Sequence, residues 1–286
     1  MNIISEFHTI ATDLDGTLLN QDAILTDFTK KVLQKAIDSK IQLIIATGRR
    51  FASVLNYSKQ FQGTVQVASS NGQILRLSPC EKRVREHYLP EFLVRTVVQK
   101  GKNFGLSPLL HVDEYEEGID MVTEIPLKHP NFMNYANGKK DRSIQLDNCL
   151  DYNLNKVTIV CWLNHDKQRL KEFDKLLKAE IGTKCSQNVI TTIPRVGPCM
   201  DVIQKDISKW SAIQEFLKIN GKSEKGVIAF GDEANDMEMI KNAGFGVALK
   251  NATDELKSVA KCVSNYSNQE DGVAKTLVEL GIVTCT

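Results

Sequence analysis

The sequence has no long apolar run and no excess of charge of one sign. No segment approaches the roughly 20 consecutive apolar residues of a membrane-spanning helix, so we expect no membrane partner. Lysine and arginine number 36 and aspartate and glutamate 35, which gives a net charge of 36 − 35 = +1. Because this balance creates no broad positive field, no nucleic-acid partner is expected either.

The seven cysteines are scattered, odd in number and never spaced as C-x-x-C. This pattern predicts neither a disulfide framework nor a zinc site, and it favours structural thiols in a reducing compartment. Residues 1–16 include Glu6 and lack a basic segment followed by an apolar one, so we expect no signal peptide. Together these features lead us to expect a cytoplasmic protein.

Short apolar runs alternate with amphipathic stretches in the first and last thirds of the chain. The runs cover residues 8–12, 41–46, 64–68, 226–230 and 245–249. Thr26 is a suitable N-cap for a helix between the first two runs. Strand–helix alternation of this kind predicts an α/β fold, with a doubly wound, mainly parallel, Rossmann-like core.

The middle of the chain has a different pattern. Helix-like stretches at 91–103 and 167–181 are mixed with segments of alternating strand character. We therefore expect an inserted α+β cap domain at residues 87–203. The catalytic core would then be formed by residues 1–86 and 204–286.

Two carboxylates directly follow the first predicted strand, in Asp13-Leu14-Asp15-Gly16-Thr17. The carboxyl ends of parallel strands form the edge at which open α/β sheets bind their ligands. Paired acids are more often a solvated turn, so the motif gains weight from the apolar strand before it and the Gly-Thr pair after it.

Thr47 and Gly48 close the second predicted strand, and Arg49 and Arg50 follow. A hydroxyl and backbone N–H groups at such a strand-to-helix turn form an anion cradle. The structural alternative is a plain connection in which Thr47 only caps the next helix.

Three acids and an amide follow a strand near the end of the chain, in Asp232-Glu233-Ala234-Asn235-Asp236. Carboxylates are the hard oxygen ligands that Mg²⁺ prefers. The alternative is an acidic helix N-terminus stabilised by the helix dipole. Lys209, at the start of another predicted helix, would by itself be an ordinary surface lysine.

In combination, the segments supply paired acids, a hydroxyl cradle, a lysine and metal-binding acids at what we expect to be four strand ends. Phosphoryl transfer needs little beyond charge neutralisation and in-line positioning. The four motifs in this order resemble the haloacid dehalogenase-like hydrolase superfamily, and within it the Cof-type phosphatases with a type IIB cap. Ser70-Asn71-Gly72 and the segments 246–252 and 270–274 match the Cof pattern as well, so the resemblance spans the chain.

The resemblance implies a Mg²⁺-dependent phosphatase that hydrolyses small phosphorylated metabolites, such as sugar phosphates, through an aspartyl-phosphate. It implies a nucleophile and metal ligand at Asp13, and a general acid/base whose backbone carbonyl also touches the metal at Asp15. The other implied roles are phosphate binding at Leu14, Thr47, Gly48, Lys209 and Asn235, a metal carboxylate at Asp232, and a supporting acid behind the metal ligands at Asp236.

Two positions depart from the family pattern, since Trp210 and Lys250 stand where glycines are usual. Neither substitution removes a catalytic group. Both are candidates for reshaping the rim of the site near the cap, so the substrate of other family members is not assigned to this chain. A phosphomutase that returns the phosphate to a sugar remains an alternative. A phospho-acceptor receiver is disfavoured, because receivers are much shorter and lack the second acid. The sequence leaves the oligomeric state open and is compatible with a monomer.

Overall fold

The computed structural model describes residues 7–136, 140–193 and 196–284. Glu6, from the start of the chain, and Cys285, one of the predicted structural thiols, lie outside the described residues. The six cysteines that are described are free thiols. No described helix combines the length and apolar character needed to cross a membrane.

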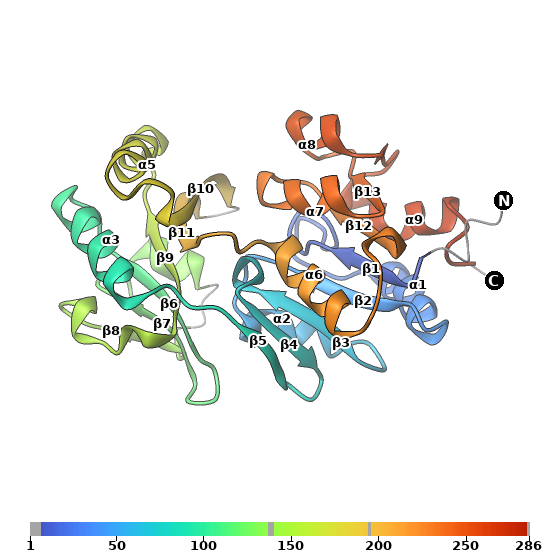
Figure 1. The fold of residues 1–286 in the computed structure, drawn as a ribbon, viewed down its shortest axis with the longest axis horizontal. Coiled ribbons are helices and arrows are strands. Elements are labelled where there is room, and N and C mark those ends of the chain that lie inside the picture. Colours follow the sequence, from blue (N-terminus) through green and yellow to red (C-terminus); the bar gives the residue numbers. More distant parts are fainter. Residues whose placement is uncertain (1–6, 137–139, 194–195, 285–286) are drawn as a thin grey trace. The chain divides into compact units, whose positions relative to one another are not determined.

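The first compact unit, the core unit, consists of Met1–Glu86 and Ser208–Thr286. Its described residues form a sheet with the strand order β14-β13-β12-β1-β2-β3-β4-β5 (Figure 1). The strands are β1 (Thr9–Thr12), β2 (Gln42–Ala46), β3 (Val65–Ser69), β4 (Ile74–Ser78), β5 (Arg83–Glu86), β12 (Val227–Gly231), β13 (Phe245–Ala248) and β14 (Cys262–Val263). Neighbouring strands are parallel from β14 to β3, whereas β4 and β5 are antiparallel additions. The predicted mainly parallel α/β core is confirmed.

Helices cover both faces of this sheet, as the right-handed connections between parallel strands require (Figure 1). They are α1 (Asp27–Asp38), α2 (Phe51–Ser58), α6 (Lys209–Ile219), α7 (Met237–Asn242), α8 (Asp254–Val259), α9 (Gly272–Glu279) and the short 3₁₀ turns η2 (Ser70–Gly72), η6 (Glu224–Gly226), η7 (Ala234–Asp236) and η8 (Asn268–Glu270). On one face, Trp210 of α6, Met239 of α7 and Leu256 of α8 join the alanines of the central strands in an apolar cluster. Alternate strand residues such as Ile10 and Ile45 are also fully buried and point to the other face.

Local hydrogen bonds set the starts of two helices. The Thr26 hydroxyl accepts from the N–H of Thr29 at 3.1 Å, so the predicted cap of α1 is confirmed. At α6, the Ser208 hydroxyl accepts from the N–H of Ser211, and the Ser211 hydroxyl accepts from the N–H of Ser208. This reciprocal capping box makes Lys209 the first residue of α6.

The second compact unit, the cap unit, consists of His87–Ile207 and contains a sheet of order β10-β11-β9-β6-β7-β8 in its described part. Its elements are α3 (Glu91–Asn103), β6 (Leu109–Glu114), β7 (Ile119–Thr123), α4 (Pro130–Tyr135), β8 (Ser143–Gln145), η3 (Cys149–Asp151), η4 (Leu154–Lys156), β9 (Val157–Leu163), α5 (Lys167–Ile181), η5 (Gly182–Lys184), β10 (Cys185–Ile193) and β11 (Gly197–Gln204). The pairing is antiparallel except between β7 and β8. The cap was predicted at residues 87–203, and this unit extends four residues further, past the end of β11 at Gln204.

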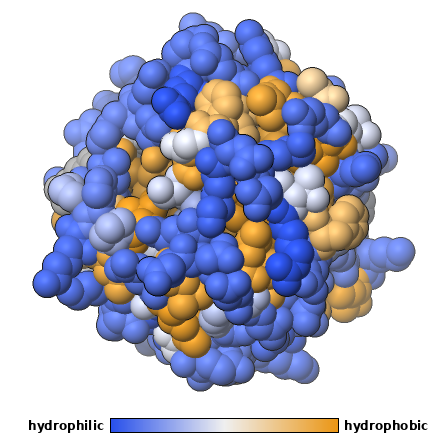
Figure 2. Space-filling model, turned by 90° about the vertical axis from the view of Figure 1, so that its left-hand side faces the viewer, coloured by the Kyte–Doolittle hydropathy of each residue, from blue (hydrophilic) through white to orange (hydrophobic). Residues whose placement is uncertain are grey.

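Apolar side chains cover both faces of the cap sheet. Trp162 of β9 and Met200 of β11 pack with residues of α3 and α5 on one face. On the other, Cys161 and Cys199 from the same two strands lie in a smaller cluster with Phe132 of α4. Figure 2 shows one surface of this unit, where hydrophilic side chains predominate and apolar ones appear in separate areas between them.

Candidate active site

The first and last predicted motifs meet at the carboxyl edge of the core sheet. Asp13 follows β1, and Asp232 follows the neighbouring parallel strand β12. The N–H of Asp13 donates to the carbonyl of Phe230 at 3.0 Å, which fixes the register of the two strand ends. The chain therefore brings acids 219 positions apart in the sequence (232 − 13) to one place on the sheet.

Three carboxylates form a buried cluster at this edge. One oxygen from each of Asp13, Asp232 and Asp236 lies within 4.8 Å of the others. Asp236 is fully buried, and the other two are less than a tenth exposed. Asp15, the other acid of the first motif, does not belong to this cluster, and its side chain is half exposed.

Lys209 supplies the positive charge in the cluster. Its Nζ donates to Oδ1 of Asp13 at 2.6 Å and to Oδ1 of Asp236 at 2.8 Å. Burial by itself would lower the pKa of Lys209, but the two carboxylates outweigh it and raise the pKa, so the side chain is a cation. The predicted position of Lys209 at the start of a helix is confirmed, whereas its grouping with the strand ends is not, because β11 already ends at Gln204. Lys209 lies at the first residue of α6, where the Ser208 capping box fixes it.

The carboxylates carry more charge than the single lysine neutralises. Burial, opposed by Lys209 and reinforced by the neighbouring acids, raises the pKa of Asp13 well above its ordinary value. Burial and then Asp236 raise the pKa of Asp232 to about 7. With all three acids ionised, the formal sum with Lys209 is −3 + 1 = −2, so the donor set fits a divalent cation that prefers oxygen ligands.

Loop contacts hold Asp232 and Asp236 in different ways. The Thr17 hydroxyl donates to Oδ1 of Asp232 at 2.6 Å. Gly16 has φ +76°, and a Cβ there would lie 2.2 Å from Oδ2 of Asp232, so this turn requires glycine. Oδ2 of Asp236 accepts from the N–H groups of Asp232 and Glu233 at 3.0 and 3.1 Å. Because its other oxygen is bonded to Lys209, Asp236 mainly supports the loop and the lysine.

The residues of the predicted phosphate cradle lie in adjoining loops of the core unit. The buried Thr47 hydroxyl accepts from the N–H of Arg49 at 3.1 Å. A Cβ on Gly48 would come within 3.2 Å of Oδ1 of Asn71, and that oxygen accepts from Nδ2 of Asn235 at 3.1 Å. Asn71 thus links the second motif to the last one.

Leu14 has a different position from the polar residues of the site. Its side chain is fully buried. Its carbonyl accepts from the N–H groups of Leu18 and Leu19 at 3.1 and 2.9 Å. Any phosphate contact at Leu14 would therefore use its backbone N–H.

The turn Ser70–Gly72 positions the start of α6. All three residues have positive φ, and Gly72 has φ +90°. A Cβ at Gly72 would lie 2.1 Å from the carbonyl oxygen of Ser208, so only glycine permits this close approach. The turn thereby supports the helix end that carries Lys209.

Arg49 also lies at the site, and no role was predicted for it from the sequence. Its Nε and Nη2 donate to the two carboxylate oxygens of Asp15 at 2.7 and 2.5 Å, and its guanidinium lies over the ring of Tyr57. Burial lowers the pKa of Arg49, but Asp15 and Tyr57 together outweigh burial and raise the pKa overall. Its position directly after Thr47-Gly48 is the one feature of the sequence that could have indicated a role for Arg49 at the site.

The two departures from the family pattern have different surroundings. The Trp210 side chain is buried in the apolar cluster of the core unit, so it does not reshape the rim of the site. Lys250 is exposed, and its Nζ lies 3.9 Å from Oε2 of Glu270. Only the second position is available for contact with another molecule.

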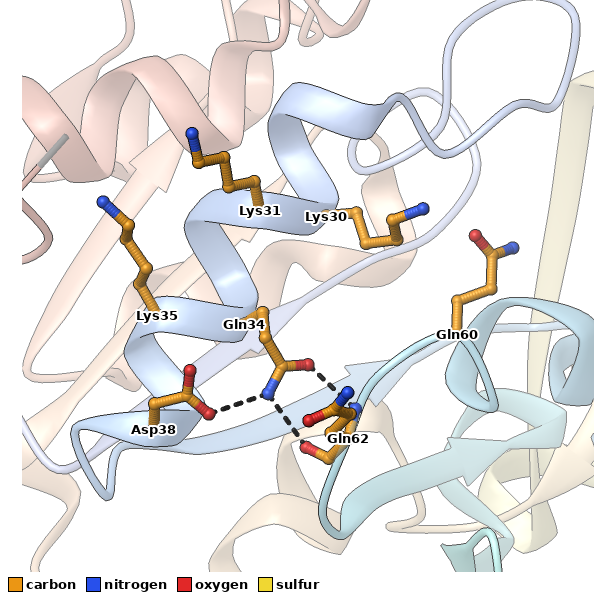
Figure 3. A pocket seen from close by; sticks show the side chains of 7 residues that line it. All are labelled: Lys30, Lys31, Gln34, Lys35, Asp38, Gln60 and Gln62. Atoms are coloured by element: carbon orange, nitrogen blue, oxygen red, sulfur yellow. Dashed lines mark hydrogen bonds between the residues drawn. The ribbon is translucent and has the colours of Figure 1, made fainter. Parts of the chain in front are cut away.

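A separate surface depression on the core unit lies between α1 and the chain after α2 (Figure 3). Gln34 of α1 bridges its two sides through hydrogen bonds with the Gln62 backbone, and its amide also donates to Asp38 on its own helix. Its other lining residues are Lys30, Lys31, Lys35 and Gln60. None of the predicted site residues lines it, and we assign it no part in the reaction.

Comparison with known proteins identifies the class. The haloacid dehalogenase-like hydrolase family matches residues 10–277, so the chain belongs to this family. It is similar to a Bacillus subtilis 5-amino-6-(5-phospho-D-ribitylamino)uracil phosphatase, with 27% identity over 94% of this chain and 96% of the relative. It is also similar to an Escherichia coli pyridoxal phosphate phosphatase, with 25% identity over 93% and 96% of the two chains. A haloacid dehalogenase-like hydrolase from Bacteroides thetaiotaomicron superimposes with a TM-score of 0.81 at 25% identity, over 96% of this chain and 99% of that one. The chain is an enzyme of the phosphatase class.

Proposed function

We propose that the chain is a Mg²⁺-dependent phosphatase that hydrolyses small phosphomonoesters through a phosphorylated Asp13. The observation that carries this proposal is the Asp13 carboxylate itself, held at the edge of the sheet by buried Lys209 and next to Asp232. Once Lys209 and a divalent cation offset the charge of the three acids, the Asp13 carboxylate could approach a phosphate without repelling it.

The proposed reaction consists of two displacements at phosphorus. In the first, an oxygen of Asp13 forms a bond to phosphorus, the bond to the leaving oxygen breaks, and Asp15 gives that oxygen a proton. In the second, Asp15 takes a proton from water, the water oxygen bonds to phosphorus, and the Asp13–phosphorus bond breaks to release inorganic phosphate. Leu14, Thr47, Gly48 and Asn235 are the proposed phosphate contacts.

The pairing of Asp15 with Arg49 has a consequence for the first step. Asp15 must leave Arg49 before it can carry and donate a proton. Both side chains are partly exposed, so water can solvate each of them when the pair opens. We infer that an arriving substrate separates the two side chains, which frees Asp15 for the leaving oxygen.

Asp13, Asp232 and the backbone carbonyl of Asp15 are the proposed Mg²⁺ ligands, with Asp236 behind them. Bound Mg²⁺ supplies positive charge that stabilises the anionic transferring group. Mg²⁺ keeps several water ligands and needs few from protein, which suits a site with two carboxylates.

The named relatives act on phosphate esters of quite different metabolites, one with a ribityl chain and one with a pyridine ring. We propose a small phosphorylated metabolite of this general size, including sugar phosphates, as the substrate in a cytoplasmic setting. The cap unit is the proposed source of specificity, because every proposed catalytic residue belongs to the core unit.

Metal replacement tests the proposed function. Phosphate release from an aryl phosphate should require Mg²⁺ and stop in excess chelator. Ca²⁺ should inhibit, because it accepts more ligands and draws Asp13 into bidentate coordination. Full turnover with chelator present would contradict the metal assignment.

A parallel panel of phosphomonoesters, assayed for both free phosphate and isomerised sugar phosphate, separates hydrolysis from a phosphomutase reaction.

A further inference from the structure

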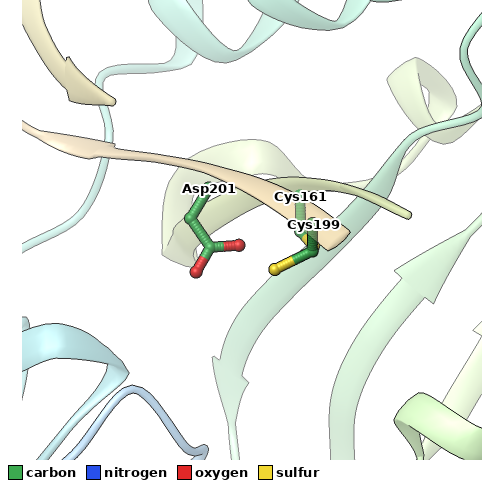
Figure 4. Close-up of side chains that lie close together, drawn as sticks. All are labelled: Cys161, Cys199 and Asp201. Carbon is green, nitrogen blue, oxygen red and sulfur yellow. The ribbon is translucent and has the colours of Figure 1, made fainter. Parts of the chain in front are cut away.

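A second group of potential metal ligands lies within the cap unit, on the central strands of its sheet. Cys161 belongs to β9, and Cys199 and Asp201 belong to β11. Asp201 is the direct antiparallel partner of Cys161, and Cys199 precedes Asp201 by two positions. Because side chains two apart in a strand share a face, all three point to the same side of the sheet. Figure 4 shows the Cys199 thiol directed toward the Asp201 carboxylate.

The three side chains are buried and close together. Their ligand atoms lie within 4.8 Å of one another, and the residues are 0%, 1% and 4% exposed in chain order. The Cys161 thiol hydrogen-bonds to the Asp201 carboxylate, and Oδ1 of Asp201 is left without a partner of its own, although a buried carboxylate oxygen normally has one. Burial raises the pKa of Asp201 to about 6 and that of Cys161 well above its ordinary value. A bound cation would compensate this unfavourable burial.

We propose that Cys161, Cys199 and Asp201 bind a thiophilic divalent cation of the Zn²⁺ type, separate from the proposed Mg²⁺ site. Two sulfurs and one carboxylate oxygen are an accepted Zn²⁺ donor set, and three protein ligands leave one position for water. Tetrahedral Zn²⁺ with Zn–S bonds of about 2.3 Å places its sulfurs about 3.8 Å apart. The present upper separation of 4.8 Å therefore requires the ligands to move together by at most about 1 Å.

This site differs in chemistry from the one in the core unit. Asp13, Asp232 and Asp236 offer only oxygen, which suits hard cations, whereas the cysteine pair favours soft ones. Occupation would replace the two thiol protons with the metal and release them to water. The absence of a C-x-x-C pair argued against a zinc site, but β-sheet pairing joins cysteines 38 positions apart (199 − 161), which local spacing does not reveal.

Cobalt titration of the full-length protein, with Mg²⁺ in excess to occupy the oxygen site, tests the proposal. Co²⁺ should bind with one-to-one stoichiometry and give a thiolate-to-metal charge-transfer absorption. Cys161→Ala and Cys199→Ala should abolish or strongly reduce this absorption. Asp201→Asn should weaken Co²⁺ binding by about 100-fold or more, which exceeds the usual loss when a residue that only hydrogen-bonds to a metal ligand is replaced. Cys149→Ala is the matched control, because it removes another fully buried cap thiol outside the cluster and should leave the titration unchanged.

X-ray absorption of the Zn²⁺-loaded, unmutated protein provides a second readout that does not depend on variant folding. Two sulfur ligands at about 2.3 Å, with oxygen completing the shell, are expected. A shell without sulfur, or the absence of a thiolate band with unmutated protein, would overturn the proposal. So would a band that survives in the folded Cys161→Ala/Cys199→Ala double variant. None of these results depends on phosphatase activity, so the proposed function is tested separately.

Discussion

The Lys209 ammonium lies between Asp13 and Asp236 and donates a hydrogen bond to each. Lys209→Met removes the one cation of the buried cluster and keeps most of the side-chain volume. We expect kcat to fall by about 10²- to 10³-fold, because a preorganised charge next to the transferring group is lost. Steady-state kinetics at saturating Mg²⁺ measure this effect, with thermal unfolding recorded in parallel.

Lys218→Met is the control, because Lys218 lies on the same helix and is exposed. It should leave kcat within about twofold, because Lys218 makes no contact with the proposed site. Its effect on stability should be no more than about 0.5 kcal/mol, as for most surface substitutions. Equal kcat values for Lys209→Met and the unmutated enzyme would remove Lys209 from the proposed site.

The residue types of the site could be predicted from sequence, but their pairings only in part. Asp13, Asp232 and Lys209 are recognisable because each begins or follows an element whose hydrophobic pattern is clear. The Arg49–Asp15 pair was missed because it depends on how two long side chains orient across adjoining loops. Spacing along the chain carries no information about that orientation.

At the scale of elements, the contact between the Ser70–Gly72 turn and the start of α6 should be essential. Gly72→Ala introduces a Cβ that would overlap the Ser208 carbonyl and also strains a residue at φ +90°. The positive φ alone costs about 1–3 kcal/mol, and the overlap should displace Lys209. We expect a lower melting temperature together with reduced kcat.

Gly221→Ala separates these two effects. Gly221 also has positive φ, +61°, but a Cβ there meets nothing within 4 Å. It should lose stability through backbone strain while keeping kcat. If the two variants lose the same stability and both keep full activity, the turn does not position the lysine.

Element prediction succeeded where the hydrophobic period was strong. The cap helices were predicted at 91–103 and 167–181, and α3 and α5 have these bounds. Strands β4 and β5 were not predicted, because both are short and their burial depends on antiparallel pairing with β3. The last motif leads into the 3₁₀ turn η7, which continues into α7.

At the scale of the whole molecule, chemistry and specificity should be separable. Replacing residues 87–207 with the cap of a related phosphatase should reorder the preferred substrates in a phosphate-release panel. Release from an aryl phosphate should persist, because Asp13, Lys209 and Asp232 all belong to the core unit. An unchanged order of substrate preference would show that the core, rather than the cap, selects the substrate.

The cluster of Cys161, Cys199 and Asp201 is also a property of the folded molecule, because it forms only when the cap sheet has formed. The sequence contained these residues, but their proximity results from antiparallel pairing between β9 and β11. Substrate identity is likewise absent from the sequence, since the proposed specificity would depend on side-chain shape in the folded cap and not on a motif.

The central claim is that Asp13 becomes phosphorylated and that Asp15 moves protons, and rapid acid quench with labelled aryl phosphate tests both parts. Asp15→Asn leaves the nucleophile intact and removes general acid–base help worth about 10²- to 10⁴-fold. An aryl leaving group needs little protonation, so the first step should suffer less than the second, and label should accumulate on the protein. Asp13→Asn should carry no label and release no phosphate. Equal labelling of both variants would contradict Asp13 as the nucleophile, and retained activity without label in Asp15→Asn would indicate direct attack by water.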